Sequence, residues 1–285
     1  MKSDLQCLVC LLKQALNTVK LVTDDEIHQR EVCNKVSRWI IEADLEKNPA
    51  EVSTVIYRIV SDVTGVKDPY KEIKEKTNRQ ALLMLPEMQN ILSQSENPLD
   101  TALHIAVAGN IIDLGIGQKF DLKKDVREIL DTPFAVNDIE HFRNELKPGR
   151  KLLFLGDNSG EIVFDRILVE HLLSYDIDIV YAVKSGPIIN DAMPEDAETA
   201  GITGLVPVIE TGSDDIGINF KNTSKEFNKE FQDADLILGK GHGNFETLSG
   251  SPQNIYFLLK AKCGVVAREA GVEKGDIVFK KNLKP

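Results

Sequence analysis

The stretch KLLFLGDNSGEIVFD, residues 151–165, decides how the rest of this sequence is interpreted. Its apolar run at residues 152–155 predicts a buried strand, and the glycine and polar residues that follow predict a turn into a helix. Open α/β sheets carry their chemistry at the carboxyl ends of strands. The pair Asp157 and Asn158 is therefore the first candidate for a functional site, with Glu161 and Asp165 at the start of the predicted helix.

Further strand-like runs follow this stretch and are separated by segments with helical character. They cover residues 178–184, 203–210, 234–240 and 254–262. Alternating buried strands and helices predict a mostly parallel sheet covered on both faces. Apolar positions before the stretch recur at helical spacing. The sequence thus predicts an α/β fold in which a helical bundle region, residues 1–146, precedes a three-layer α/β/α catalytic domain, residues 147–285.

The overall composition is that of an ordinary globular protein. The chain has 285 residues, of which 42% are hydrophobic and 28% charged. A net charge of −11 argues against nucleic acid or an anionic membrane as a partner, because both require clustered lysine and arginine. No apolar run approaches the roughly 20 residues of a membrane span, and the start MKSDLQC lacks a leader pattern. We expect a cytoplasmic protein, whose oligomeric state the sequence leaves open.

Four cysteines are present: Cys7, Cys10, Cys33 and Cys263. Cys7 and Cys10 form a CxxC, which is compatible with half a zinc site, a redox pair or two structural thiols. No second CxxC and no paired histidines complete a tetrahedral zinc site. The sequence favours small buried thiols in a reducing compartment, with redox or disulfide pairing as the alternative.

Polar clusters follow three of the predicted strands. They are Asp157 with Asn158, residues 184–191 (KSGPIIND) and residues 240–246 (KGHGNFE). Equivalent strand ends lie at one edge of a parallel sheet, so these clusters are expected to converge. Aspartate and asparagine oxygens suit Mg²⁺ or Mn²⁺, ions that keep water positions which a substrate phosphate can take. Lys240 would supply a positive charge for that phosphate.

Each cluster also has a purely structural explanation. DNSG is a common turn composition, and Asp191 could cap a helix that begins at Ala192. Gly241 and Gly243 lack the third glycine of a dinucleotide fingerprint and lie too late in the chain for one. The convergence of three clusters is what favours a functional site over three turns.

The segment TALHIAVAGNIIDLG, residues 101–115, predicts a buried helix that carries polar side chains. Asn110 and Asp113 are three residues apart and share a face of this helix, which also holds His104. Buried polar groups need partners. Asn110 and Asp113 therefore either bond to a neighbouring loop or reach the active site and contact substrate, and both alternatives stay open.

Five blocks of the sequence, in order, resemble one known family. They are CLVCLLKQAL (7–16), NPLDTALHIAVAGNIIDLG (97–115), FLGDNSGEIVFDRILVE (154–170), VKSGPIINDAMPEDA (183–197) and ADLILGKGHGNFETL (234–248). The family is the metal-dependent damage-control phosphatases, also known as domain of unknown function 89, and the CxxC is similar to its short prokaryotic-type subfamily. The resemblance implies a helical bundle packed on an α/β/α domain, and hydrolysis of phosphate monoesters of small damaged or surplus metabolites such as sugar phosphates.

The resemblance also implies roles for individual residues. By motif, Asp157, Asn158 and Asp191 would bind a divalent cation, which would be Mn²⁺, Co²⁺, Ni²⁺ or Mg²⁺. Lys240 would contact the substrate phosphate. The remaining substrate-binding residues expected near the pocket are Ser159, Asn244 and Glu246, together with Asn110 and Asp113 if that helix reaches the site.

The residues fit direct attack of water on the phosphorus better than a covalent route. A cation between two carboxylates and an amide oxygen would neutralise charge on the transferred group, and Glu161 or Asp191 could act as the base. Asp157 is placed where a nucleophile could act, but position 159 is serine, so the DxD spacing that would support a phosphorylated aspartate is missing. Whether water or a carboxylate attacks stays open.

Two other functions fit parts of the same pattern. One is carboxyl methyl transfer from S-adenosylmethionine, and the other is binding of a phosphometabolite or nucleotide without catalysis. A methyltransferase normally has a glycine-rich first loop and an acidic residue after the next strand. Here that strand is followed by Lys184 and Ser185 instead, which favours the phosphatase. The identity of the metabolite and the natural metal are not predicted.

Overall fold

A seven-stranded sheet forms the centre of the protein in a computed structural model that describes residues 1–112 and 128–282. The strands lie in the order β1-β7-β6-β5-β2-β3-β4. Their bounds are β1 (Val136–Asn137), β2 (Lys151–Leu155), β3 (Asp178–Val183), β4 (Val208–Glu210), β5 (Leu236–Lys240), β6 (Ile255–Lys260) and β7 (Ile277–Lys281). Neighbouring strands pair in parallel except β6 and β7, which are antiparallel. The predicted mostly parallel sheet is confirmed.

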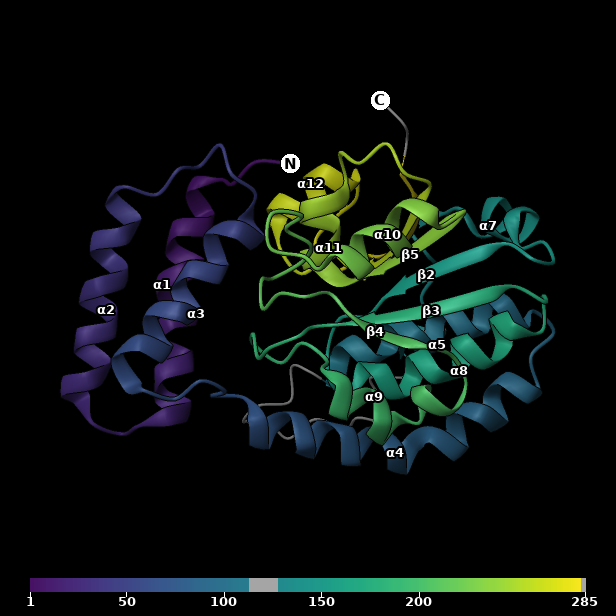
Figure 1. Ribbon diagram of the computed structural model, residues 1–285, viewed down its shortest axis with the longest axis horizontal. Helices are drawn as coiled ribbons and strands as arrows, with labels where there is room; N and C mark the ends of the chain where they lie inside the picture. The colour runs from purple at the N-terminus through teal and green to yellow at the C-terminus, as the bar shows by residue number, and fades with distance from the viewer. Residues whose placement is uncertain (113–127, 283–285) are drawn as a thin grey trace.

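Helices cover both faces of the sheet, and three more stand beside it (Figure 1). α4, α5, α8 and α9 lie on one face and α10, α11 and α12 on the other, which gives the three predicted layers. The bounds are α1 (Leu5–Val22), α2 (Glu26–Ile41), α3 (Pro49–Thr64), α4 (Lys71–Ser93), α5 (Pro98–Ile112), α7 (Ile139–Glu145), α8 (Glu161–Leu173), α9 (Pro194–Ala200), α10 (Lys225–Asp233), α11 (Gly241–Leu248) and α12 (Gly264–Ala270).

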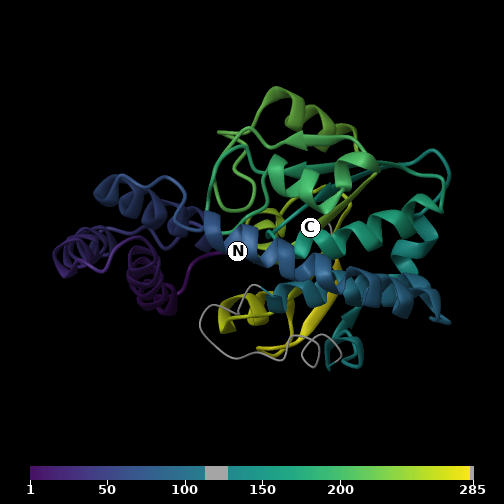
Figure 2. The ribbon, with the colours of Figure 1, turned by 90° about the horizontal axis from the view of Figure 1, so that it is seen from below.

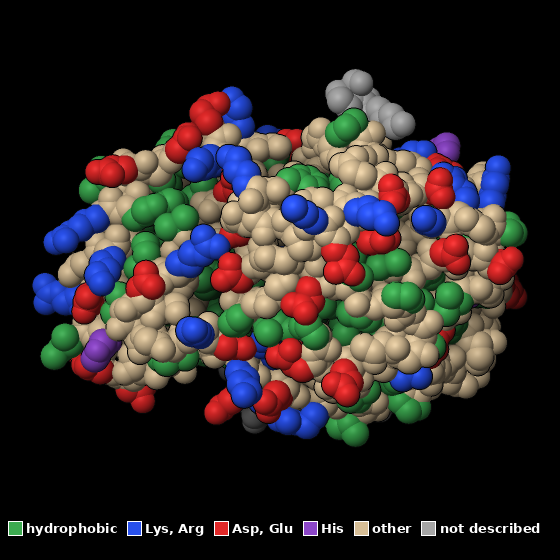
Figure 3. Space-filling view, viewed as in Figure 1, with side chains coloured by type: hydrophobic (Ala, Val, Ile, Leu, Met, Phe, Trp, Pro, Cys, Tyr) green, Lys and Arg blue, Asp and Glu red, His purple; other side chains and the backbone are tan. Residues whose placement is uncertain are grey.

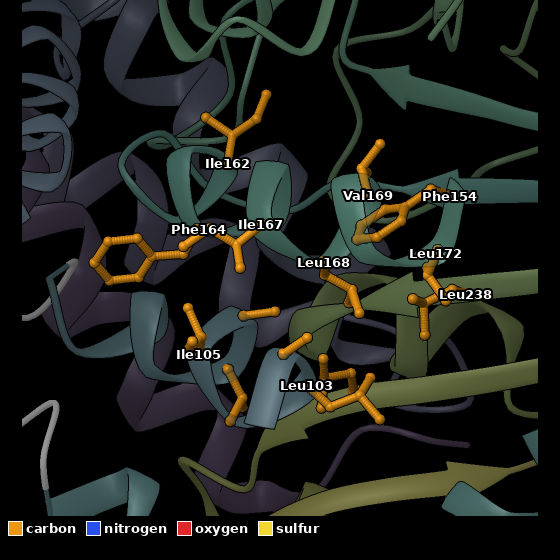
Figure 4. Packing of buried hydrophobic residues seen from close by; sticks show 14 of the residues in the cluster. Leu103, Ile105, Phe154, Ile162, Phe164, Ile167, Leu168, Val169, Leu172 and Leu238 are labelled. Atoms are coloured by element: carbon orange, nitrogen blue, oxygen red, sulfur yellow. The ribbon is translucent and has the colours of Figure 1, made fainter. Parts of the chain in front are cut away.

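Strand β2 shows why the sheet is buried on both sides. Leu152 and Phe154 point to the core shared with α5 and α8, whereas Leu153 and Leu155 point to the core shared with α10 and α11. Figure 4 shows Phe154 and Leu238 of the sheet beside the apolar side chains of α8 and α5. A strand covered on both faces reads as a continuous apolar run, which is why residues 152–155 were recognisable as a strand.

The structure departs from the strand predictions at the run 203–210 and at β1 and β7. The run at 203–210 forms a strand only at Val208–Glu210, because residues Ile202–Gly204 make a 3-10 turn and Pro207 cannot donate to a ladder. β1 and β7 were not predicted. β1 has two residues and carries no periodicity, and β7 returns antiparallel beside β6 and ends in two lysines.

Residues 1–146 divide between two places in the fold. Helices α1, α2 and α3 form a small bundle with its own core, to which Leu11, Val36 and Ile56 belong. α4 and α5 instead pack against α8 and share the sheet's core, and β1 pairs with β7. Figure 2, a view from below, shows α4 running across the front of the sheet while α1 to α3 lie to one side. The domain boundary at residue 146 stays a prediction. In the packing, only α1 to α3 have a core separate from that of the sheet.

Helix α1 revises one expectation about membranes. Among the described helices, it is the one that is long and apolar enough to cross a membrane by length and composition, and 22% of its residues are buried in the fold. Its buried residues, among them Leu11, Ala15 and Val19, pack into the bundle core. A core helix passes the same test, so α1 alone is weak support for a span, and the cytoplasmic location stays a prediction.

On the face seen in Figure 3, basic and acidic side chains are interspersed.

Candidate metal and phosphate site

The loops that follow β2 and β3 are joined to each other by their main chains. Ser159 N donates to Asn190 O at 2.9 Å, and Ala192 N donates to Asp157 O at 2.8 Å. Asn158 and Asp191 form an isolated antiparallel bridge between these hydrogen bonds. Because β2 and β3 are parallel neighbours, their carboxyl ends meet at the same edge. The structure therefore brings together the three residues that the sequence proposes as metal ligands.

These three side chains lie at a cavity of about 320 Å³ between the sheet edge and the α1–α3 bundle. The sheet side contributes residues that follow β2, β3, β4, β5 and β6, and the opposite wall comes from α1 and α3. The lining residues are Gln14, Ala50, Ser53, Tyr57, Asp157, Asn158, Ile189, Asn190, Asp191, Ile216, His242, Gly243, Glu246 and Lys262. In the sheet, β3 and β4 lie on one side of β2, whereas the later strands β5 and β6 lie on its other side. The strand order therefore reverses at β2, and the cavity lies at this topological switch point, where open α/β sheets bind ligands.

Hydrogen bonds orient the amide of Asn158. Its Nδ2 donates to Asp157 Oδ2 at 2.9 Å and more weakly to Glu161 Oε2 at 3.4 Å. With the NH₂ group engaged on that side, the carbonyl oxygen is the part of the amide that a cation can use. Gly241 lies directly against Asp157, since a Cβ built on it would come 1.8 Å from Oδ2, and its φ of +74° favours glycine.

The electrostatics of the site favour a bound cation. Burial, together with the negative charges of Glu161 and Asp191, raises the pKa of Asp157 well above its usual range. Lys184 Nζ lies 3.7 Å from Asp191 Oδ2 and donates to Gly217 O at 2.5 Å. Two carboxylates and an amide oxygen make a donor set for a hard divalent cation. No group of three His, Cys, Asp or Glu side chains in the described chain is arranged for a metal, so this set depends on its asparagine.

Lys240 and Glu161 lie beneath the cavity and do not line it. The ammonium of Lys240 is fully buried and donates to Glu161, Asp165 and the carbonyl oxygen of Ala106. The predicted phosphate contact of Lys240 and the predicted base role of Glu161 therefore lack access to a substrate in this structure. The reason is strand geometry: Lys240 is two residues after Leu238 and points to the same face, under α5 and α8.

The remaining predicted residues have mixed positions. Glu246 lines the cavity. Asn244 does not; its Nδ2 donates to Lys240 O at 2.8 Å and Gly156 O at 3.2 Å, which ties α11 to the end of β2. Ser159 is buried and contacts the neighbouring loop through its backbone. Asp113 and the side chain of Asn110 lie outside the described residues, so their contact with substrate stays a prediction.

Lys262 and His242 also line the cavity, although no role was predicted for either of them from the sequence. Lys262 was assigned to the predicted strand 254–262, but β6 ends at Lys260, so Lys262 belongs to the loop that follows β6. Its backbone N donates to His242 Nε2 at 2.9 Å. Burial and the charge of Lys262 lower the pKa of His242 to about 4. At neutral pH the cavity therefore presents a lysine ammonium beside an uncharged imidazole.

A second cavity of about 390 Å³ continues from the first along α1. The two share five lining residues: Gln14, Ser53, His242, Glu246 and Lys262. The far end is lined by Cys7, Cys10 and Cys263, all with free thiols. Burial raises the pKa of the Cys7 and Cys10 thiols, which disfavours reactive thiolates. The CxxC thus forms part of a cavity wall. Cys7 is half-buried and Cys10 is exposed, whereas buried thiols were expected.

Glu246 gives the site a pH dependence that can be measured. Burial raises the pKa of Glu246 from 4.5 to about 8, so the folded chain holds a proton that the unfolded chain releases near pH 4.5. We expect this residue's contribution to the free energy of unfolding to fall as the pH rises from 4.5 to 8, by about 1.4 kcal/mol per pH unit. Glu246→Gln removes the titration.

The measurement is urea unfolding in EDTA at several pH values between 5 and 8.5. The variant should become more stable relative to the wild type as the pH rises, while Glu226→Gln, at an exposed position, serves as the matched control. A difference between Glu246→Gln and wild type that stays constant across this range would contradict the assignment.

Comparison with known proteins places the chain in a family. The model of the damage-control phosphatase ARMT1-like domain matches residues 3–278. The chain is 36% identical to damage-control phosphatase PH1575 of Pyrococcus horikoshii, covering 99% of each chain, and 37% identical to a damage-control phosphatase of Archaeoglobus fulgidus, covering 98% of this chain and 99% of the relative.

A solved structure agrees with these relatives. The crystal structure of a DUF89 family protein, PH1575 from Pyrococcus horikoshii, superimposes with a TM-score of 0.92 at 34% identity, covering 99% of this chain and 100% of the other. The match spans the α1–α3 bundle as well as the sheet, so the whole architecture is shared. The chain therefore belongs to the damage-control phosphatase ARMT1-like family.

Proposed function

We propose that this member of a phosphatase family hydrolyses phosphate monoesters of small damaged or surplus metabolites, sugar phosphates among them, with a divalent cation. Asp157, Asn158 and Asp191 would hold the cation, which we expect to be Mn²⁺, Co²⁺, Ni²⁺ or Mg²⁺. The observation that carries the proposal is the main-chain bridge that joins these three donors at the edge of a cavity containing a lysine. Family membership supports the reaction class.

When bound, the cation would neutralise charge on the phosphoryl group and make water more acidic. The chain's own residues do the rest. Lys262 lines the same cavity and would attract the phosphate oxygens, the role that the sequence had given to Lys240. Lys184, close to Asp191, would limit the repulsion between that carboxylate and the incoming phosphate.

Asp191 is the candidate base, because it lines the cavity and Glu161 does not. It would accept a proton from water as the water oxygen bonds to phosphorus and the phosphorus–oxygen bond to the leaving group breaks. The leaving oxygen then takes a proton from Asp191 or from solvent, giving inorganic phosphate and an alcohol. Asp157 also lines the cavity, so attack by its carboxylate stays the alternative. Trapping a phosphorylated chain after rapid acid quench would support that alternative.

The second cavity would receive the leaving group. It continues from the metal-facing cavity through Gln14, Ser53 and Glu246, whose neutral or protonated side chains can bond to hydroxyl groups. Its far wall is formed by α1, with Cys7, Cys10 and Leu11. A polar leaving group of several carbon atoms fits these walls, which supports phosphorylated polyols or sugars as the substrates to test first.

Removal of the metal tests the proposed reaction. Hydrolysis of p-nitrophenyl phosphate should fall to background after treatment with excess EDTA and dialysis. It should return on addition of Mn²⁺, Co²⁺, Ni²⁺ or Mg²⁺, because the donor set is made of hard oxygen atoms. A panel of phosphorylated metabolites, assayed by release of inorganic phosphate, then identifies the substrate.

The other two functions predict different results in the same assay. Activity that is indifferent to EDTA would exclude the metal-dependent route. No hydrolysis with any of the four metals, together with tight binding of S-adenosylmethionine or of an unhydrolysed phosphometabolite, would favour methyl transfer or binding without catalysis.

A further inference from the structure

A fully buried charged cluster lies directly beneath the proposed metal site. Lys240 Nζ donates to Glu161 Oε1 at 2.5 Å, to Asp165 Oδ1 at 2.6 Å and to Ala106 O at 3.0 Å. The side chains of Lys240, Glu161 and Asp165 have no exposed area. All three N–H donors of the ammonium are therefore used, and none is directed at the cavity.

The cluster is connected at both ends. Tyr181 donates its hydroxyl proton to Asp165 Oδ2 at 2.7 Å. At the other end, Glu161 Oε2 accepts from Asn158 Nδ2 at 3.4 Å, and Asn158 Nδ2 also donates to Asp157 Oδ2. Each oxygen of Glu161 thus has one partner: Oε1 faces Lys240 and Oε2 faces the amide of a proposed metal ligand.

The packing around Glu161 leaves it little freedom to move. A Cβ on Gly109 of α5 would lie 2.8 Å from Glu161 Cα and 2.9 Å from its Cγ, so glycine is needed for the close approach of α5 and α8. The carbonyl of Ala106, one turn earlier on α5, fixes the third direction of the ammonium. Lys240 and Glu161 are therefore held in one arrangement by α5, α8 and β5.

We propose that Lys240 is a positioning residue that acts through Glu161 to orient the amide of Asn158, so that the carbonyl oxygen of Asn158 faces the cation. This inference rests on the proposed metal site. The chain of contacts runs from Lys240 to Glu161 Oε1, and from Glu161 Oε2 to the NH₂ group of Asn158. Partners behind metal ligands typically change metal affinity by about 10- to 100-fold when they are lost.

A charged pair placed only for stability would not need this connection. Buried ion pairs contribute little net stability, because desolvation offsets their attraction. Such a pair could also be replaced by apolar side chains without effect on a neighbouring site. Here Glu161 contacts the proposed metal ligand Asn158, whereas Asp165 contacts Tyr181. Variants of these two carboxylates can therefore be compared for their effect on metal binding.

The first test compares Glu161→Gln with Asp165→Asn. Each removes one carboxylate charge next to Lys240 and leaves the other to balance the ammonium, so both variants should fold. In Glu161→Gln, the new amide accepts from Lys240 through its oxygen and turns its NH₂ group toward that of Asn158. We expect Glu161→Gln to weaken Mn²⁺ binding by about 10-fold or more, and Asp165→Asn to change it by less than about threefold. Mn²⁺ affinity is measured by electron paramagnetic resonance of the free ion.

The second test separates orientation from charge. Lys240→Met removes a positive charge beneath a cation site, so a purely electrostatic effect would tighten Mn²⁺ binding. The positioning role predicts weaker binding instead. It also predicts that Lys240→Met has almost no further effect in the Glu161→Gln background, since Glu161→Gln already breaks the link between residue 161 and Asn158 through which Lys240 would act. If Lys240→Met does not fold, Lys240→Gln takes its place: loss of the charge alone would tighten Mn²⁺ binding, whereas a retained hydrogen-bond donor to Glu161 would leave it near the wild-type value.

Failure of the inference is distinguishable from failure of the proposed function. If the wild type binds no Mn²⁺, the proposed metal site is wrong. If the wild type binds Mn²⁺ and hydrolyses phosphate monoesters, but Glu161→Gln and Asp165→Asn weaken Mn²⁺ binding equally, or Lys240→Met tightens it, then the positioning role is wrong and the function stands.

Discussion

Replacement of Asp157 by alanine is expected to lower kcat/KM for phosphate monoesters by about a thousandfold, more than the loss of an outer-shell partner costs. Asp157 would supply one of the two carboxylates that hold the cation, and it lines the cavity. The same variant should unfold at an equal or higher temperature in EDTA. Burial and the neighbouring carboxylates raise the pKa of Asp157, so its charge destabilises the metal-free fold at neutral pH.

The opposite directions of the two effects make this prediction specific. A variant that is inactive because it unfolds would lose both activity and thermal stability. Asp215→Asn is a suitable control, since Asp215 is also buried near the cavity but pairs with Arg58 and Asn222. Full activity of Asp157→Ala with added Mn²⁺ would rule out the metal site. The measurements are steady-state kinetics with each metal and thermal unfolding with EDTA.

Replacement of Gly241 by alanine is expected to abolish metal-dependent activity as well. The added methyl group would lie 1.8 Å from Asp157 Oδ2, so the carboxylate must move. The φ of +74° adds a backbone cost of about 1–2 kcal/mol for a residue with a Cβ. We expect Mn²⁺ affinity and kcat/KM to fall by about 100-fold or more, with a modest loss in the unfolding temperature.

Gly250→Ala is the matched control for Gly241→Ala. Gly250 follows the same helix, α11, and a Cβ there meets no atom within 4 Å. That variant should keep wild-type Mn²⁺ binding and activity. Wild-type Mn²⁺ affinity in Gly241→Ala would show that the position of the Asp157 carboxylate against α11 does not matter for the cation.

The sequence was sufficient for the parts of the fold that follow one strong pattern. Strands β2, β3, β5 and β6 are continuous apolar runs, and the polar residues after them had to meet at one edge of a parallel sheet. This reasoning brought Asp157, Asn158 and Asp191 together correctly. It was less useful for β1, a two-residue edge strand whose pairing depends on distant β7.

Side-chain direction was harder to predict than position in the chain. Lys240 was assigned to the phosphate because it ends a strand, but alternation along β5 turns it under the sheet with Leu236 and Leu238. Lys262 was overlooked because an apolar pattern does not mark where β6 ends. Both differences concern a single residue at a strand end, where one step along the chain changes which face the side chain reaches.

The cavity has two walls of different origin, and this affects how the protein can change. Side chains that would carry out the reaction lie at strand ends of the sheet, whereas half of the residues that line the second cavity come from α1 and α3, which have a separate core. If that cavity receives the leaving group as proposed, substitutions in the bundle would alter which metabolite is accepted without disturbing the residues that would bind the cation. Under the proposed function, one part of the selectivity would therefore be encoded in a segment that folds around its own core, apart from the residues that would bind the cation.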